Sequence, residues 1–146
     1  MIERYPSIII EYVCKGIVPM MQLFALYVIT HGHYSPGGGL LGGVILAASF
    51  ILMRLVLGGE YSYGKFSPRG AIALGTVGVL LFGIAGVLPL ATGGRFLDYE
   101  YLPILWTSGA SLRSLGILVV EVGIGLAVCG VLVTIFDNLV GRGSDV

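Results

Sequence analysis

The chain has 146 residues, of which 56% are hydrophobic and only 11% are charged. An average soluble domain is roughly 25% charged, and a small domain has a large surface to cover with polar groups. Eight basic and eight acidic residues are too few for that, so the composition excludes a water-soluble globular domain and indicates lipid as the solvent. The formal net charge of zero also excludes the basic field that attracts nucleic acid.

Apolar stretches follow one another along the chain at residues 8–30, 40–57, 71–90 and 116–135. Each is long enough to cross the bilayer, since about 17–25 residues suffice for a helix. Backbone groups in lipid must form hydrogen bonds within their own segment, which requires helices. We therefore predict an all-α membrane protein with four transmembrane helices, in which residues 1–146 form one domain. Cys14 and Cys129 lie within apolar stretches, where we expect buried, unpaired thiols.

The basic residues predict how the helices are oriented. If the four helices alternate in direction, Arg95 and Arg113 fall on one side of the membrane and six basic residues fall on the other. The six are Arg4, Lys15, Arg54, Lys65, Arg69 and Arg142. The positive-inside rule then places both termini in the cytoplasm, as in a multi-pass protein of the cell membrane. Lys15 and Arg54 lie inside apolar stretches, and we expect their long side chains to extend toward the membrane surface.

The first stretch contains an acid and a base at helical spacing. Glu11 precedes Lys15 by four residues, the favourable order for an ion pair on a helix. Pro19 follows, and its missing N–H leaves the carbonyl of Lys15 without its usual partner. Two interpretations stay open: an ion pair at the membrane interface, or a lysine that faces an ion path in a partner subunit.

The connector at residues 31–39 contains two histidines and the run Pro36-Gly37-Gly38-Gly39. Histidine titrates near neutrality, but His31 and His33 have no cysteine or carboxylate nearby in sequence, so we predict no metal site. The glycines before a helix could bind an anion at the helix N-terminus. A tight turn that allows close helix packing is the simpler role, and we favour it.

Small residues recur at helical spacing on the later stretches. Helix association in lipid depends on close backbone approach through such residues. The series are Gly39, Gly43 and Ala47; Ala71, Gly75 and Gly78; Gly123, Ala127, Gly130 and Thr134; and Gly125 with Cys129. Two small faces on the fourth stretch indicate neighbours on two sides, and we expect the protein to pack against other subunits.

Glu121 is the main candidate for chemistry. It lies five residues after Gly116, ~7.5 Å along the fourth helix, and an ionisable group at membrane depth is costly to bury. Its neighbours on its own helix are apolar or glycine, so a partner must come from another helix or subunit. Its carboxyl group could bond a neighbouring helix, or it could relay protons or bind a cation beside a hydrated path. Asp137, at the end of this stretch, we expect to be solvated.

The turn also carries a resemblance to a known family. Gly32-His33-Tyr34-Ser35-Pro36-Gly37-Gly38-Gly39-Leu40-Leu41-Gly42-Gly43 resembles the Gly-His-x-x-Pro-Gly-Gly-Gly-Phe-x-Gly-Gly signature of the MnhB/MrpB-type subunit of multisubunit Na+/H+ antiporters. A proline-containing first helix precedes the motif, and an acid followed two residues later by glycine, here Glu121 and Gly123, ends the pattern. Leu40 departs from the common Phe, and Glu121 departs from the common Asp.

The resemblance implies an integral membrane subunit of a cation/proton antiporter. Its partners would be other hydrophobic subunits, antiporter-type and small, within the bilayer; its transported ions would be Na+ or H+, and this chain would hold no cofactor and no catalytic residue. Candidates for the ion or proton path are Glu121, His33, Lys15 and Glu11. Residues expected to shape the turn are Gly32, Pro36, Gly37, Gly38, Gly39, Gly42 and Gly43. The same module occurs in redox-driven pumps such as membrane-bound hydrogenases, so that alternative and a purely structural subunit stay open.

Overall fold

The computed structural model describes residues 7–32, 37–99 and 110–142. It contains four helices: α1 (Ile8–Thr30), α2 (Gly38–Lys65), α3 (Pro68–Ala91) and α4 (Ala110–Arg142). All four are long and apolar enough to cross a membrane, and the described residues include no strand. The predicted class, an all-α protein with four transmembrane helices, is therefore confirmed.

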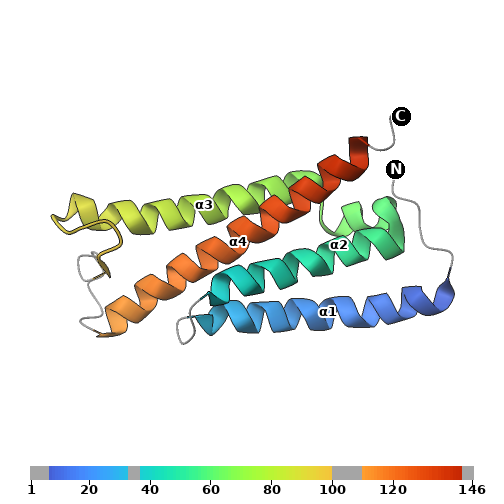
Figure 1. Ribbon diagram of the computed structural model, residues 1–146, viewed down its shortest axis with the longest axis horizontal. Coiled ribbons are helices and arrows are strands. Elements are labelled where there is room, and N and C mark those ends of the chain that lie inside the picture. Colours follow the sequence, from blue (N-terminus) through green and yellow to red (C-terminus); the bar gives the residue numbers. More distant parts are fainter. Residues whose placement is uncertain (1–6, 33–36, 100–109, 143–146) are drawn as a thin grey trace.

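The helices run alternately up and down, so the bundle has two distinct ends (Figure 1). We call the end at which α1 begins and α4 ends the terminal end. At the opposite end, here the turn end, α1 leads into α2 and α3 leads into α4. Which end faces the cytoplasm stays a prediction from the basic residues.

α2 is longer than the apolar stretch that predicts it, because it continues beyond a kink. Gly58 has a φ of 82°, a left-handed conformation that glycine adopts without steric cost, and the helix resumes after it as far as Lys65. The hydroxyl of the fully buried Ser62 donates to the carbonyl oxygens of Gly58 (2.8 Å) and Gly59 (3.2 Å). Residues 59–65, which read as connector in the sequence, are therefore a short helical segment that changes direction.

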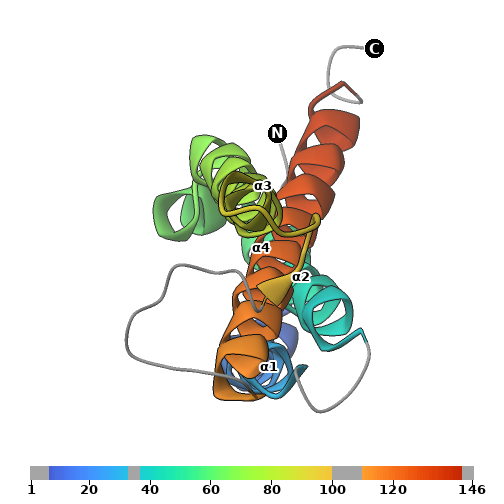
Figure 2. The ribbon, with the colours of Figure 1, turned by 90° about the vertical axis from the view of Figure 1, so that its left-hand side faces the viewer.

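α4 is the central helix of the bundle. It packs against α3 on one side and α2 on the other, while α1 packs against α2. Figure 2 shows α4 crossing the bundle obliquely when viewed from the turn end. It contacts α1 near this end, where a Cβ on Gly125 would lie 3.0 Å from the Cδ1 atom of Ile29. With 33 residues, α4 is ~50 Å long and exceeds the hydrocarbon thickness even when tilted.

The two small-residue faces of α4 are both covered within this chain. A Cβ on Gly130 would lie 2.5 Å from the carbonyl oxygen of Ala71 on α3, and a Cβ on Gly43 of α2 would lie 2.6 Å from the carbonyl oxygen of Gly125. The prediction of neighbours on two sides is confirmed. These neighbours are α2 and α3 of the same chain.

Replacing Gly130 with Ala is expected to separate α3 from α4, because its Cβ would meet the backbone of α3. Overpacking of this kind costs about 1–3 kcal/mol. In mixed micelles, the variant should therefore unfold at a lower mole fraction of SDS than the wild type. Gly83→Ala is the matched control, since a Cβ at Gly83 of α3 meets nothing within 4 Å. Equal unfolding midpoints for the two variants would show that the interface between α3 and α4 is not close-packed at Gly130.

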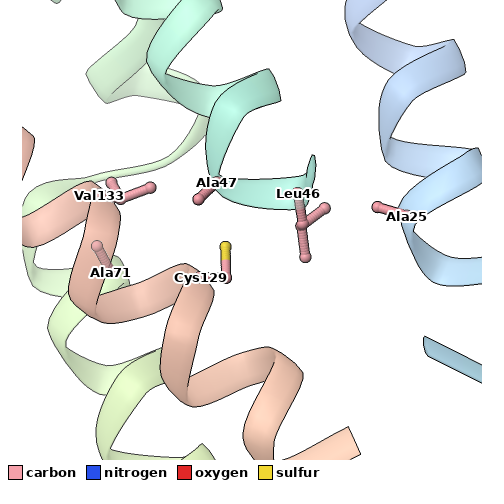
Figure 3. Packing of buried hydrophobic residues seen from close by; sticks show 6 residues of the cluster. All are labelled: Ala25, Leu46, Ala47, Ala71, Cys129 and Val133. Carbon is pink, nitrogen blue, oxygen red and sulfur yellow. The ribbon is translucent and has the colours of Figure 1, made fainter. Parts of the chain in front are cut away.

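The apolar core runs across the bundle, from α1 through α2 and α4 to α3. Its fully enclosed members are small or β-branched, which lets the packed helices approach closely. Figure 3 shows the cluster of Ala25, Leu46, Ala47, Ala71, Cys129 and Val133. Cys14 and Cys129 are both buried and unpaired, as predicted. Many large apolar side chains of α1 and α3 are instead exposed, which suits a surface in contact with lipid or with partner subunits.

Candidate functional site: a carboxylate at the start of α2

Glu121 of α4 meets the first turn of α2. Its Oε2 accepts a hydrogen bond from the backbone N–H of Gly39, the second residue of that helix. Gly37 occupies the N-cap position and has no side chain to cap the helix. The first N–H groups of a helix lack partners within the helix, and a helix N-terminus attracts negative charge. The Glu121 carboxylate therefore caps α2 from a different helix.

Glycines of the turn make room for this contact. A Cβ on Gly39 would lie 2.5 Å from Glu121 Oε2, and a Cβ on Gly32 would lie 3.2 Å from the same atom. A Cβ on Gly38 would collide with the Cα of Gly32. Gly37 has a φ of 86°, in the region that favours glycine. The turn thus packs tightly and also presents an N–H group to an anion, and the anion is a carboxylate of the same chain.

Gly42 and Gly43, the last two glycines of the motif, face different helices. A Cβ on Gly42 would lie 2.9 Å from the carbonyl oxygen of Ala25, so this glycine faces α1, whereas Gly43 faces α4. His33 and Pro36 lie outside the described residues. The described part of the motif therefore lies where α1, α2 and α4 converge.

Tyr99, from the connector between α3 and α4, lies at the same end of the bundle. A Cβ on Gly116 would lie 2.7 Å from the Cγ atom of its ring. Burial, and then the negative charge of Glu121, raise the pKa of the Tyr99 hydroxyl. Sequence reasoning did not anticipate the proximity of Tyr99 to Glu121.

Glu11 and Lys15 form the ion pair that their spacing predicts, with 2.6 Å between Lys15 Nζ and Glu11 Oε1. They lie on α1 toward the terminal end, whereas Glu121 lies toward the turn end. The structure thus does not bring these three candidates together into one site.

A second charged cluster was not anticipated. Arg54 of α2 is fully buried and forms an ion pair with Asp137 of α4, whose side chain is 9% exposed. Its guanidinium also donates to the carbonyl oxygen of Phe66 (3.2 Å), and its Cζ lies 5.2 Å from the centre of the Tyr63 ring. The expectations that Arg54 reaches the membrane surface and that Asp137 is solvated are both wrong.

The kink at Gly58 explains the burial of Arg54. The segment after the kink carries Tyr63 and Phe66 back over the guanidinium, and the ring of Phe66 stacks on Phe50 with 4.2 Å between centroids. Arg54 lies four residues before the kink, and Asp137 lies five residues before the end of α4. Opposite charges at matching depths on α2 and α4, which run in the same direction, were the available signal.

The fold and these clusters define the class: a multi-pass membrane protein with ionisable groups held between its helices. A family model described as "Domain related to MnhB subunit of Na+/H+ antiporter" matches residues 9–134, and the chain belongs to this family. It is similar to the provisionally named antiporter subunit mnhB2 of Staphylococcus aureus strains Newman, JH1 and Mu3. Each is 35% identical over 142 residues, which cover 94% of this chain and 97% of the relative. No solved structure matches the chain.

Proposed function

We propose that this chain is a non-enzymatic subunit of a multisubunit Na+/H+ antiporter of the cell membrane, and that Glu121 handles the transported ion or proton. Membership of the MnhB family and the full-length similarity to antiporter subunits support the first part. They do not favour the redox-driven pump or the purely structural subunit. A subunit of such a complex has other membrane subunits as partners.

The observation that carries the second part is the position of the Glu121 carboxyl group. Its Oε2 is held by the N–H of Gly39, while its Oε1 makes no hydrogen bond within the described part of the chain. The residue is only partly buried. One oxygen therefore fixes the group in place, and the other is available to a proton, a cation or a partner side chain.

The path for that ion would lie at a subunit boundary. Beyond Glu121, the interface of α4 with α2 contains an apolar layer of Leu46, Ala47, Cys129 and Val133, which separates Glu121 from the buried Arg54–Asp137 pair. Charged groups in membranes are stable where they face a bundle interior or a water-filled cavity. The partly exposed side of Glu121 is thus the side on which a hydrated path would run, between this chain and a companion subunit.

Affinity purification of the tagged chain from its native membrane in mild detergent tests the assignment to an antiporter. We expect the co-purifying chains, identified by mass spectrometry, to be antiporter subunits present in fixed ratio. Tagging an unrelated multi-pass protein of the same membrane provides the control for non-specific capture. Iron–sulfur or nickel-containing subunits in fixed ratio would instead assign the chain to a redox-driven pump.

A further inference from the structure

A groove of about 330 Å³ opens on the surface between α1 and α2, in the half of the bundle nearer the terminal end. Its chemistry changes along its length. Lys15, Lys65 and Tyr61 line the part nearest the terminal end, whereas the floor is made by apolar side chains that include Val18 and Met53. The groove is therefore charged at one end and mainly apolar beyond it, with Gln22 as the polar exception, as suits an amphiphilic molecule.

The charged part of the groove has an excess of positive charge. Glu11 neutralises Lys15 at 2.6 Å, and the Lys15 ammonium lies 5.7 Å from the centre of the Tyr61 ring. Among the residues that the structure describes, no acid pairs with Lys65. Glu11 thus balances the charge of Lys15, whereas the charge of Lys65 is left without an anion in this part of the chain.

We propose that this groove binds one anionic phospholipid, with the phosphate at Lys15 and Lys65 and an acyl chain along the apolar floor. Basic pockets between transmembrane helices on the cytoplasmic side bind anionic headgroups, and this is the end that the basic residues predict to be cytoplasmic. Lys15 lies ~10 Å along α1 from Ile8, and its stem reaches toward the headgroups. Lys65 is the last residue of α2, and Tyr61 has the amphipathic ring typical of the interface.

A helix of a partner subunit is the competing occupant, and Gln22 distinguishes the two. This residue lines the groove seven positions after Lys15, farther from the terminal end. A partner helix seated in the groove would bond the Gln22 amide, because polar side chains in lipid are satisfied across helix interfaces. A phospholipid held by its phosphate depends on the lysines instead.

Native mass spectrometry of the purified complex, stripped of lipid and then titrated with phosphatidylglycerol or phosphatidylcholine, tests this proposal. We expect the complex to bind one phosphatidylglycerol that it does not exchange for phosphatidylcholine. Its affinity should fall about fivefold in Lys65→Gln, since one lysine near the surface contributes about that much. The fall in Lys15→Gln/Lys65→Gln should be only slightly larger, because Glu11 already offsets the charge of Lys15. Arg69→Gln, an exposed base at the same end of the bundle, and Gln22→Leu should bind phosphatidylglycerol as the wild type does.

Three results would overturn the proposal. They are equal binding of the two lipids, unchanged phosphatidylglycerol affinity in the lysine variants, and loss of a subunit from the spectrum of Gln22→Leu. The last result would assign the groove to a partner helix. The mass of every species reports whether all subunits are present, so a variant that fails to assemble is recognised directly. In that case Lys65→Gln alone, at an exposed position, decides. The outcome is independent of any role of Glu121, which lies toward the other end of the bundle.

Discussion

Replacing Arg54 with Met is expected to destabilise the protein by about 3–5 kcal/mol, the cost of leaving one partner of a buried ion pair uncompensated. The substitution keeps a long apolar stem but leaves the Asp137 carboxylate enclosed, 9% exposed, with no cation beside it. It also removes the donor to the Phe66 carbonyl, which tethers the segment after Gly58. Asp137→Leu should cost a similar amount, because it leaves a fully buried guanidinium unpaired.

The double variant Arg54→Met/Asp137→Leu tests whether the destabilisation comes from the one charge that each single variant leaves unpaired. Replacing both members of a buried pair by apolar residues is often neutral or stabilising, so the double variant should unfold near the wild-type midpoint. The measurement is SDS-induced unfolding in mixed micelles. Arg69→Met, at an exposed position, is the control and should change stability by less than about 0.5 kcal/mol. A double variant destabilised by the sum of the two single costs would show that the two charges act independently.

The hydropathy pattern was sufficient to predict the number of helices and their type, and the spacing of charges on one helix was sufficient to indicate the ion pair on α1. These features depend on one segment at a time: on its length, its apolar content and the spacing of Glu11 and Lys15. The same pattern ended the second helix at Leu57, because Gly58 and the polar residues after it resemble a connector. Residues 59–65 are helical because Ser62 bonds the carbonyls exposed by the kink, a local compensation that hydropathy does not encode.

Contacts between helices were beyond the sequence alone. Glu121 and the glycine turn were each recognised as a candidate, but the hydrogen bond that joins them spans 82 residues. It depends on the relative position of α2 and α4 along their common interface. The positions of Arg54 and Asp137 were predicted wrongly for the same reason. Each was placed by its depth in the membrane alone, without considering the other as a partner. The small-residue series correctly indicated close packing on two sides of α4, but a pattern on one helix does not name its neighbour.

Glu121→Gln is expected to abolish most of the transport while leaving the structure intact. The amide keeps the shape of the side chain, and its oxygen still accepts from the N–H of Gly39, so α2 remains capped. It has neither the charge that attracts a cation nor the ability to exchange a proton near neutrality. We expect Na+-driven proton movement to fall about a hundredfold, the lower end of what a positioned proton-transferring group contributes. Glu121→Asp, which restores the residue common in the family that this turn resembles, should transport.

The most direct measurement is therefore the Na+-dependent collapse of a pH gradient in everted membrane vesicles that contain the complex. Four versions are compared at equal complex content: wild type, Glu121→Gln, Glu121→Asp and Glu60→Gln, the last an exposed acid on the segment beyond Gly58. Transport that is lost in Glu121→Gln alone, from a complex with its full set of subunits, is the predicted result. Wild-type transport by the assembled Glu121→Gln complex would contradict the role of this carboxyl group and leave it as a helix cap.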